Sequence, residues 1–158
     1  MSKKNFWNQT KSLLVTYNFK DESDIKEFRS ALDKQLNQSA VERIIIIVSV
    51  PRHIDKTKLS PHFLIYYNSP SDYTFFGKLK DVQLKAELKQ SFHLMLSFGT
   101  LERKIKKHLE GVEIAKKIIV NADLGKDSSY EMELNSASES PLEIVNFVIE
   151  TLQKIDVK

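Results

Sequence analysis

The chain has 158 residues and a net charge of +3; 41% of its residues are hydrophobic and 28% are charged, which excludes a disordered chain and predicts a globular domain. It contains no cysteine, which excludes disulfides, thiolate catalysis and cysteine-ligated metal centres and is typical of the reducing cytoplasm. No apolar run approaches about 18 residues, and MSKKNFWNQTK lacks the apolar core of a signal peptide, so we expect a cytoplasmic protein that does not enter a membrane.

The first half of the chain alternates between strand and helix patterns. LLVTYNF (residues 13–19) predicts a strand, and residues 21–38 predict a helix with Asp21 as its N-cap. RIIIIVSV (residues 43–50) is a continuous, largely β-branched run, typical of a strand that is buried on both faces. FLIYY (residues 63–67) predicts a third strand before an NSPS turn.

The second half continues this alternation and ends in a strongly marked helix. Gly111 follows a predicted helix at the place of a left-handed C-terminal cap. Ser140 and Glu143 form the pattern of a capping box, with Pro141 at the first helical position. The expected elements before that last helix are a helix over residues 81–90, a strand over 92–98, a helix over 101–110, a strand over 117–121 and an edge strand over 130–134.

Alternating strands and helices predict an α/β fold. We expect a single-domain, Rossmann-like sandwich over residues 12–158, with a mostly parallel sheet, helices on both faces and room for one antiparallel edge strand. Residues 1–11 are expected to form a short polar N-terminal segment. The pattern does not define the order of the strands or the oligomeric state.

Motifs for catalysis and for cofactor binding are missing. Gly77-Lys78 resembles the end of a phosphate loop, but the motif requires glycine at position 72, which is Asp, and Ser or Thr at position 79, which is Leu. Four glycines in the whole chain leave no GxGxxG fingerprint, and the four histidines have no spacing that suits a shared metal ion. We therefore predict no catalytic residues, no metal site and no cofactor. A binding protein is favoured over an enzyme, although an enzyme stays open and no motif identifies a reaction.

The carboxyl ends of the strands are the place where an open α/β sheet binds ligands. The SFGT turn after the strand over residues 92–98 offers backbone N–H groups and hydroxyls to an anion. The alternative is that Thr100 only caps its helix and Gly99 only eases the turn. The candidate site for a small phosphorylated ligand consists of Ser97, Gly99, Thr100, Asn121 and Asp123.

The basic run RKIKKH (residues 103–108) is a second candidate site. Residues 76–118 carry ten basic and five acidic side chains, whereas residues 119–158 carry three and eight. Such a helix face can contact phosphates without reading sequence, although a solvated face of long lysines is the alternative. Aromatic residues are not interleaved with these lysines, which weakens a single-strand interpretation. The candidate nucleic-acid-binding residues are Arg103, Lys104, Lys106 and Lys107, extended by Lys78, Lys80, Lys85 and Lys89.

The stretch DYTFFGKLKD (residues 72–81) places two phenylalanines beside a glycine and two lysines. Because the phosphate-loop spacing fails, we interpret it as a packing hinge. Phe75 and Phe76 would anchor the crossing between two parts of the sheet, and Gly77 would let the chain turn into the next helix.

Four segments together carry a resemblance to a known family. FFGKLK, LKAELKQSFHLMLSF and AKKIIVNAD, followed by a closing helix that ends in LQKI, resemble an uncharacterised Bacteroidota family of small α/β proteins with a domain of unknown function. The resemblance covers the chain from Leu13 onward and implies its fold, but no activity. The chain departs from the family pattern at His93, where Asp is common, and at Asn121-Ala122-Asp123, where Gly is more usual.

These observations lead to two functional hypotheses. The first is a cytoplasmic, non-enzymatic binding or accessory module with a protein or ribonucleoprotein partner, associated with the ribosome or with RNA. The second is an enzyme or sensor that binds a small phosphorylated ligand at the carboxyl ends of the strands.

Overall fold

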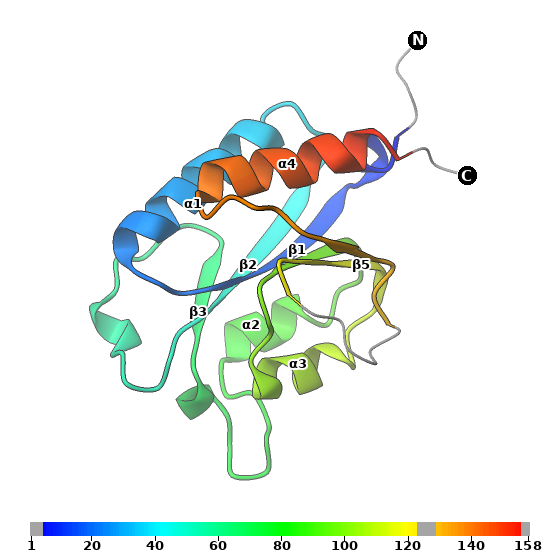
Figure 1. Ribbon diagram of the computed structural model, residues 1–158. Helices are drawn as coiled ribbons and strands as arrows, with labels where there is room; N and C mark the ends of the chain where they lie inside the picture. The colour runs from blue at the N-terminus through cyan, green and yellow to red at the C-terminus, as the bar shows by residue number, and fades with distance from the viewer. Residues whose placement is uncertain (1–4, 123–128, 156–158) are drawn as a thin grey trace.

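The computed structural model describes residues 5–122 and 129–155. Ten regular elements follow one another along the chain, and three short 3₁₀ turns lie among them (Figure 1). The strands are β1 (Ser12–Asn18), β2 (Arg43–Ser49), β3 (Ile65–Asn68), β4 (Phe92–Phe98), β5 (Ile114–Val120) and β6 (Met132–Leu134). The helices are α1 (Glu22–Leu36), α2 (Val82–Glu87), α3 (Arg103–Leu109) and α4 (Pro141–Gln153), and the 3₁₀ turns are η1 (Trp7–Gln9), η2 (Lys56–Lys58) and η3 (Pro70–Asp72).

The six strands form one sheet in the order β3-β2-β1-β4-β5-β6. Each neighbouring pair of these strands runs parallel, which confirms the predicted α/β fold. The chain builds outward from β1 to β3 and then returns to place β4 on the other side of β1, so the order reverses between β1 and β4. The edge strand for which an antiparallel direction was left open is β6. It pairs parallel with β5, and Met132 of β6 lies opposite Ile118 of β5.

Helices cover both faces of the sheet (Figure 1). In β2, Ile44, Ile46 and Val48 belong to the core beneath α1 and α4, whereas Ile45 and Ile47 belong to the core beneath α2 and α3. This two-sided burial explains the unbroken β-branched run, since neither side of the strand meets water.

Local capping interactions explain where the helices begin. Asp21 caps α1 through a hydrogen bond that its carboxylate accepts from the backbone N–H of Asp24, as predicted. Ser140 likewise caps α4, but the carboxylate of Glu143 accepts a hydrogen bond from the hydroxyl of Ser138, so only half of the expected capping box forms. Gly111 is not in the left-handed region, so the prediction of a left-handed C-terminal cap there is wrong; α3 ends in right-handed backbone at Glu110.

The N-terminal segment packs against the end of the chain. Trp7 is buried in the core under α4, and the backbone N–H of Phe6 donates to the carbonyl of Ile155 over 2.8 Å. Phe6 and Trp7 of this segment are therefore part of the packed fold.

Candidate functional site

Residues 73–79 form a short antiparallel hairpin that leads from η3 to α2. Tyr73 pairs with Leu79 at its base, and the backbone N–H of Thr74 donates to the carbonyl of Lys78 over 2.7 Å. A turn closes the tip, where the N–H of Gly77 donates to the carbonyl of Thr74 over 2.8 Å. Gly77 has φ +82°, in the left-handed region that glycine adopts without steric cost.

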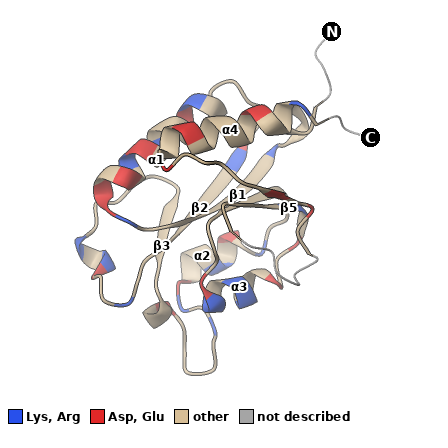
Figure 2. Ribbon diagram, in the orientation of Figure 1, with Lys and Arg blue, Asp and Glu red and all other residues tan. Residues whose placement is uncertain are grey.

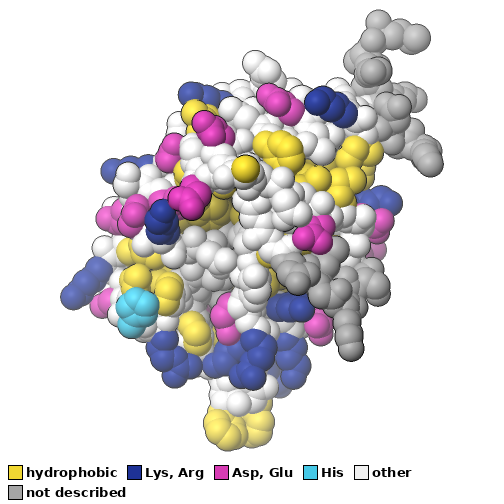
Figure 3. All heavy atoms as spheres, in the orientation of Figure 1, with side chains coloured by type: hydrophobic (Ala, Val, Ile, Leu, Met, Phe, Trp, Pro, Cys, Tyr) yellow, Lys and Arg dark blue, Asp and Glu magenta, His cyan; other side chains and the backbone are white. Residues whose placement is uncertain are grey.

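Phe75 and Phe76 lie at the tip of this hairpin and project into solvent. Phe75 is 98% exposed and Phe76 is 85% exposed, so the expectation that they anchor a packing hinge is wrong. Tyr73 and Leu79 pair with each other, and both of their side chains point into the core. The turn between them, which carries the two phenylalanines, lies outside the core. In Figure 3 the hairpin forms an apolar protrusion next to a band of Lys and Arg side chains.

The base of the hairpin is held by two side chains. Tyr73 is buried, and its hydroxyl donates to Oδ1 of Asn68 over 2.9 Å. Burial raises the pKa of Tyr73, so this hydroxyl keeps its proton and remains a donor. From α3, Nζ of Lys104 donates to the carbonyl of Pro70 over 3.1 Å and lies 5.9 Å from the centre of the Tyr73 ring. Lys104 thus joins the basic helix α3, whose Lys and Arg residues Figure 2 shows in blue, to the hairpin.

A basic groove runs between the hairpin and α3, and we call it the hairpin groove. Its volume is about 720 Å³. It is lined by the two exposed phenylalanines and by three of the four residues predicted to bind nucleic acid. Its charged and aromatic lining consists of Arg52, Tyr73, Phe75, Phe76, Lys80, Arg103, Lys104 and Lys107.

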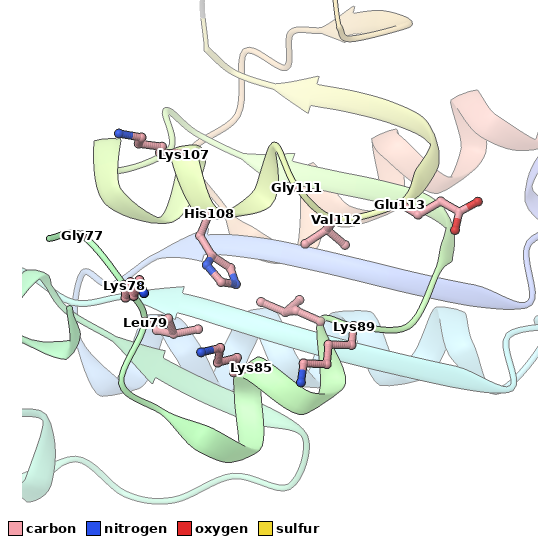
Figure 4. A pocket seen from close by; sticks show the side chains of 11 residues that line it. Gly77, Lys78, Leu79, Lys85, Lys89, Lys107, His108, Gly111, Val112 and Glu113 are labelled. Carbon is pink, nitrogen blue, oxygen red and sulfur yellow. The ribbon is translucent and has the colours of Figure 1, made fainter. Parts of the chain in front are cut away.

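A second groove lies between α2 and α3, and we call it the interhelix groove (Figure 4). It has a volume of about 760 Å³ and an apolar floor formed by Leu79, Leu88 and Val112. Gly77 and Lys107 line both grooves, so the two meet at the hairpin. The charged or titratable residues that line the interhelix groove are Lys78, Lys85, Lys89, Lys107, His108 and Glu113.

The pKa of His108 is affected by burial and by the positive charge of the interhelix groove. Its ring extends from α3 toward Lys85 of α2 (Figure 4). Burial and the positive charge of Lys85 lower the pKa of His108 below its ordinary value. Protonation of this ring is therefore opposed in the free protein, and a bound anion would relieve that opposition.

Lys106 is separated from the other residues predicted to bind nucleic acid. It lines a smaller groove with Glu110, Lys117 and Tyr130 on the other side of α3. Arg103, Lys104 and Lys107 face the hairpin groove, because at 3.6 residues per turn positions 103, 104 and 107 fall on one side of the helix and position 106 does not.

The residues predicted to bind a phosphorylated ligand do not form one open site among the described residues. Ser97 is fully buried on the sheet, and Asn121 accepts a hydrogen bond from the backbone of Ser136. The carbonyl of Thr100 accepts from the side chain of Asn18, and Thr100 does not cap α3. The cap is Glu102, whose carboxylate accepts from two backbone N–H groups. Gly99 makes the turn after β4 at φ +84°, and Asp123 lies outside the described residues.

Most of the basic residues of the grooves were predicted from the sequence, but their position beside the aromatic tip was not. Arg52 follows β2 and lies far from the hairpin along the chain, so only the fold could bring it to the hairpin groove. A local signal for the exposed tip does exist. Two aromatic residues directly before a glycine, between the pairing residues Tyr73 and Leu79, have the pattern of a short hairpin turn.

In residues 5–122 and 129–155, no three His, Asp or Glu side chains are grouped so that they could hold a metal ion. Over the same ranges, no helix has the length and apolar character needed to span a bilayer. A scan against models of protein families finds no match, and searches of the curated proteins and of the solved structures find none either. The resemblance to the Bacteroidota family therefore stays a prediction.

Proposed function

We propose that this chain is a non-catalytic binding module and that the face formed by the hairpin, α2 and α3 binds RNA. The observation that carries the proposal is the junction of the two basic grooves at Gly77 and Lys107. Together these grooves are lined by eight Lys and Arg side chains, and Glu113 is the only acidic residue among the described residues that line them.

This charge distribution suits a polyanion. Lysines placed along a groove can each displace counterions from a phosphate, which makes binding favourable and dependent on salt. Two joined grooves offer more contacts than a single phosphate group can use, so a chain of phosphates fits better than an isolated anion. The composition without cysteine, typical of the cytoplasm, makes RNA the polyanion to test first.

The direct test is fluorescence anisotropy with a labelled RNA oligonucleotide over a series of KCl concentrations. We expect binding to weaken as salt rises, with a slope of about 0.7 for each phosphate that the protein neutralises. Lys85→Gln and Lys107→Gln should each reduce the affinity and the slope, because both side chains line the interhelix groove.

The matched control is Lys26→Gln. Lys26 is exposed on α1, on the opposite side of the sheet, so its removal changes the net charge equally and leaves the grooves intact. Absence of RNA binding would contradict the proposal. Equal losses in the Lys26, Lys85 and Lys107 variants would also contradict it, since they would indicate an effect of net charge alone.

The second candidate is an enzyme or sensor for a small phosphorylated ligand at the carboxyl ends of the strands. The observation that favours it is a pair of buried hydroxyls, on Thr16 and Ser97, which are partners in the register of β1 and β4. Neither hydroxyl has a hydrogen-bond partner in the described part of the chain. Thermal unfolding with inorganic phosphate or ATP tests this candidate, with stabilisation expected to vanish in Ser97→Ala.

A further inference from the structure

We propose that Phe75 and Phe76 stack on unpaired bases, so that this surface selects single-stranded over double-stranded RNA. The inference rests on the proposed function and names the form of RNA that the site takes. It begins from an apolar feature that the basic grooves alone do not explain.

The two rings have no role in the core. The ring centres lie 5.5 Å apart with an angle of 86° between their planes, and the rings contact each other edge to face. With Phe75 98% exposed and Phe76 85% exposed, broad ring surfaces remain open to solvent. Exposed aromatic faces next to lysines are the elements from which sequence-tolerant single-strand sites are built.

The hairpin also holds the rings in place before any ligand arrives. Its base is fixed by the buried hydrogen bond between Tyr73 and Asn68 and by the bond from the N–H of Lys80 to the carbonyl of Asp72, 2.7 Å long. The carboxylate of Asp72 is in turn paired with Lys56 at 2.5 Å. A rigid platform loses little conformational freedom when a base stacks on it, which favours affinity.

The position of the tip explains the preference for a single strand. The rings line the hairpin groove and directly precede Gly77, which lines both grooves together with Lys107. A backbone that follows the lysines of the grooves would pass the phenylalanines, and a flexible strand can turn its bases onto them. In a duplex the faces of the bases are already covered by their neighbours, so stacking on the rings would require unstacking.

An exposed apolar tip beside lysines also resembles a membrane-inserting loop. The grooves favour RNA, because Lys78, Lys85 and Lys89 line a concave surface that extends away from the tip between α2 and α3 (Figure 4). A strand lying in that groove contacts these lysines along its length, whereas a flat bilayer would meet mainly the tip.

The test compares a labelled single strand with the same sequence in a blunt duplex, using the wild-type protein, Phe75→Ala/Phe76→Ala and Phe75→Leu/Phe76→Leu. We expect the alanine variant to lose affinity for the single strand by on the order of tenfold or more and to bind the duplex as before. The salt slope should not change, because the phosphate contacts remain. A 2-aminopurine base in the single strand should be quenched by the wild-type protein alone.

The leucine variant distinguishes stacking from apolar insertion. Leucine keeps an apolar side chain but lacks a π-face, so we expect it to lose the single-strand preference as fully as alanine does. If either double variant keeps the preference, the inference is overturned. If the Phe variants bind RNA like wild type while Lys85→Gln and Lys107→Gln weaken RNA binding, the proposed RNA binding is supported and the stacking role of the phenylalanines is contradicted.

Two further outcomes separate this inference from the proposed function. A wild-type protein that binds no RNA overturns both. A protein that binds phosphatidylserine vesicles but no RNA also overturns both. If the alanine variant loses this vesicle binding and the leucine variant keeps it, the tip is assigned to a membrane surface. Unchanged thermal unfolding of both Phe variants serves as the check that the fold is intact.

Discussion

Tyr73 and Asn68 are joined by a buried hydrogen bond in which the Tyr73 hydroxyl donates to Oδ1 of Asn68 over 2.9 Å. Asn68 is the last residue of β3, at one edge of the sheet, and Tyr73 begins the hairpin. The bond therefore fixes the hairpin, and the two phenylalanines at its tip, relative to the sheet.

Removal of this bond should weaken the fold without altering the surface of the hairpin. Tyr73→Phe takes away the donor and leaves Oδ1 of Asn68 buried without it, so we expect the free energy of unfolding to fall by about 1–2 kcal/mol in urea denaturation. Tyr66→Phe is the matched control, because burial and the charges of Glu87 and Asp81, and no hydrogen bond among the described residues, account for the raised pKa of its hydroxyl. Equal losses in the two variants would show that the bond contributes nothing specific.

Exposure at the hairpin tip predicts a second contrast. Phe76→Ala should change the free energy of unfolding by no more than about 0.5 kcal/mol, since 85% of the residue already faces solvent. Leu84 of α2 is fully buried beneath the same face, and Leu84→Ala should cost about 2–5 kcal/mol through lost packing and a residual cavity. Urea denaturation of both variants tests the contrast, and a large loss in Phe76→Ala would restore a packing role for the tip.

The sequence predicted the fold because its local signals agree with its long-range packing. The buried run of β2 and the N-caps at Asp21 and Ser140 each lie where their residue types predict them. The strand order could not be read in the same way, because it depends on the crossover that places β4 beside β1. No local pattern encodes which edge of the sheet the chain returns to.

The candidate site was predictable only in part, for a similar reason. Three residues of the basic helix face one groove, as their charge suggested, but the turn of the helix directs Lys106 elsewhere. Phe75 and Phe76 were expected to anchor a packing hinge because the spacing of a phosphate loop fails in this stretch. Their exposure follows from the pairing of Tyr73 with Leu79, an interaction that becomes visible only when the hairpin is folded.

The two left-handed glycines should respond differently to alanine. Gly77→Ala meets no atom within 4 Å, so we expect only the backbone cost of its φ of +82°, about 1–2 kcal/mol. Gly99→Ala has nearly the same φ, but its Cβ would lie 2.7 Å from Nδ2 of Asn18 and would disturb the bond from Asn18 to the carbonyl of Thr100. We expect a further loss of about 1 kcal/mol in urea denaturation. Equal losses would contradict the steric argument.

His108 should make RNA binding depend on pH. Burial and the charge of Lys85 lower the pKa of His108 below its ordinary value of 6.5. As pH falls through about 6.5, the unfolded chain therefore takes up a proton before the folded, RNA-free protein does, and the free energy of unfolding decreases. A phosphate chain in the interhelix groove, lined also by Lys78 and Lys89, would favour the protonated ring, so affinity should rise as pH falls from 7.5 to about 5.5. Anisotropy at constant ionic strength measures this rise, and His62→Gln, outside that groove, should retain it. The same rise in His108→Gln would show that another group is responsible.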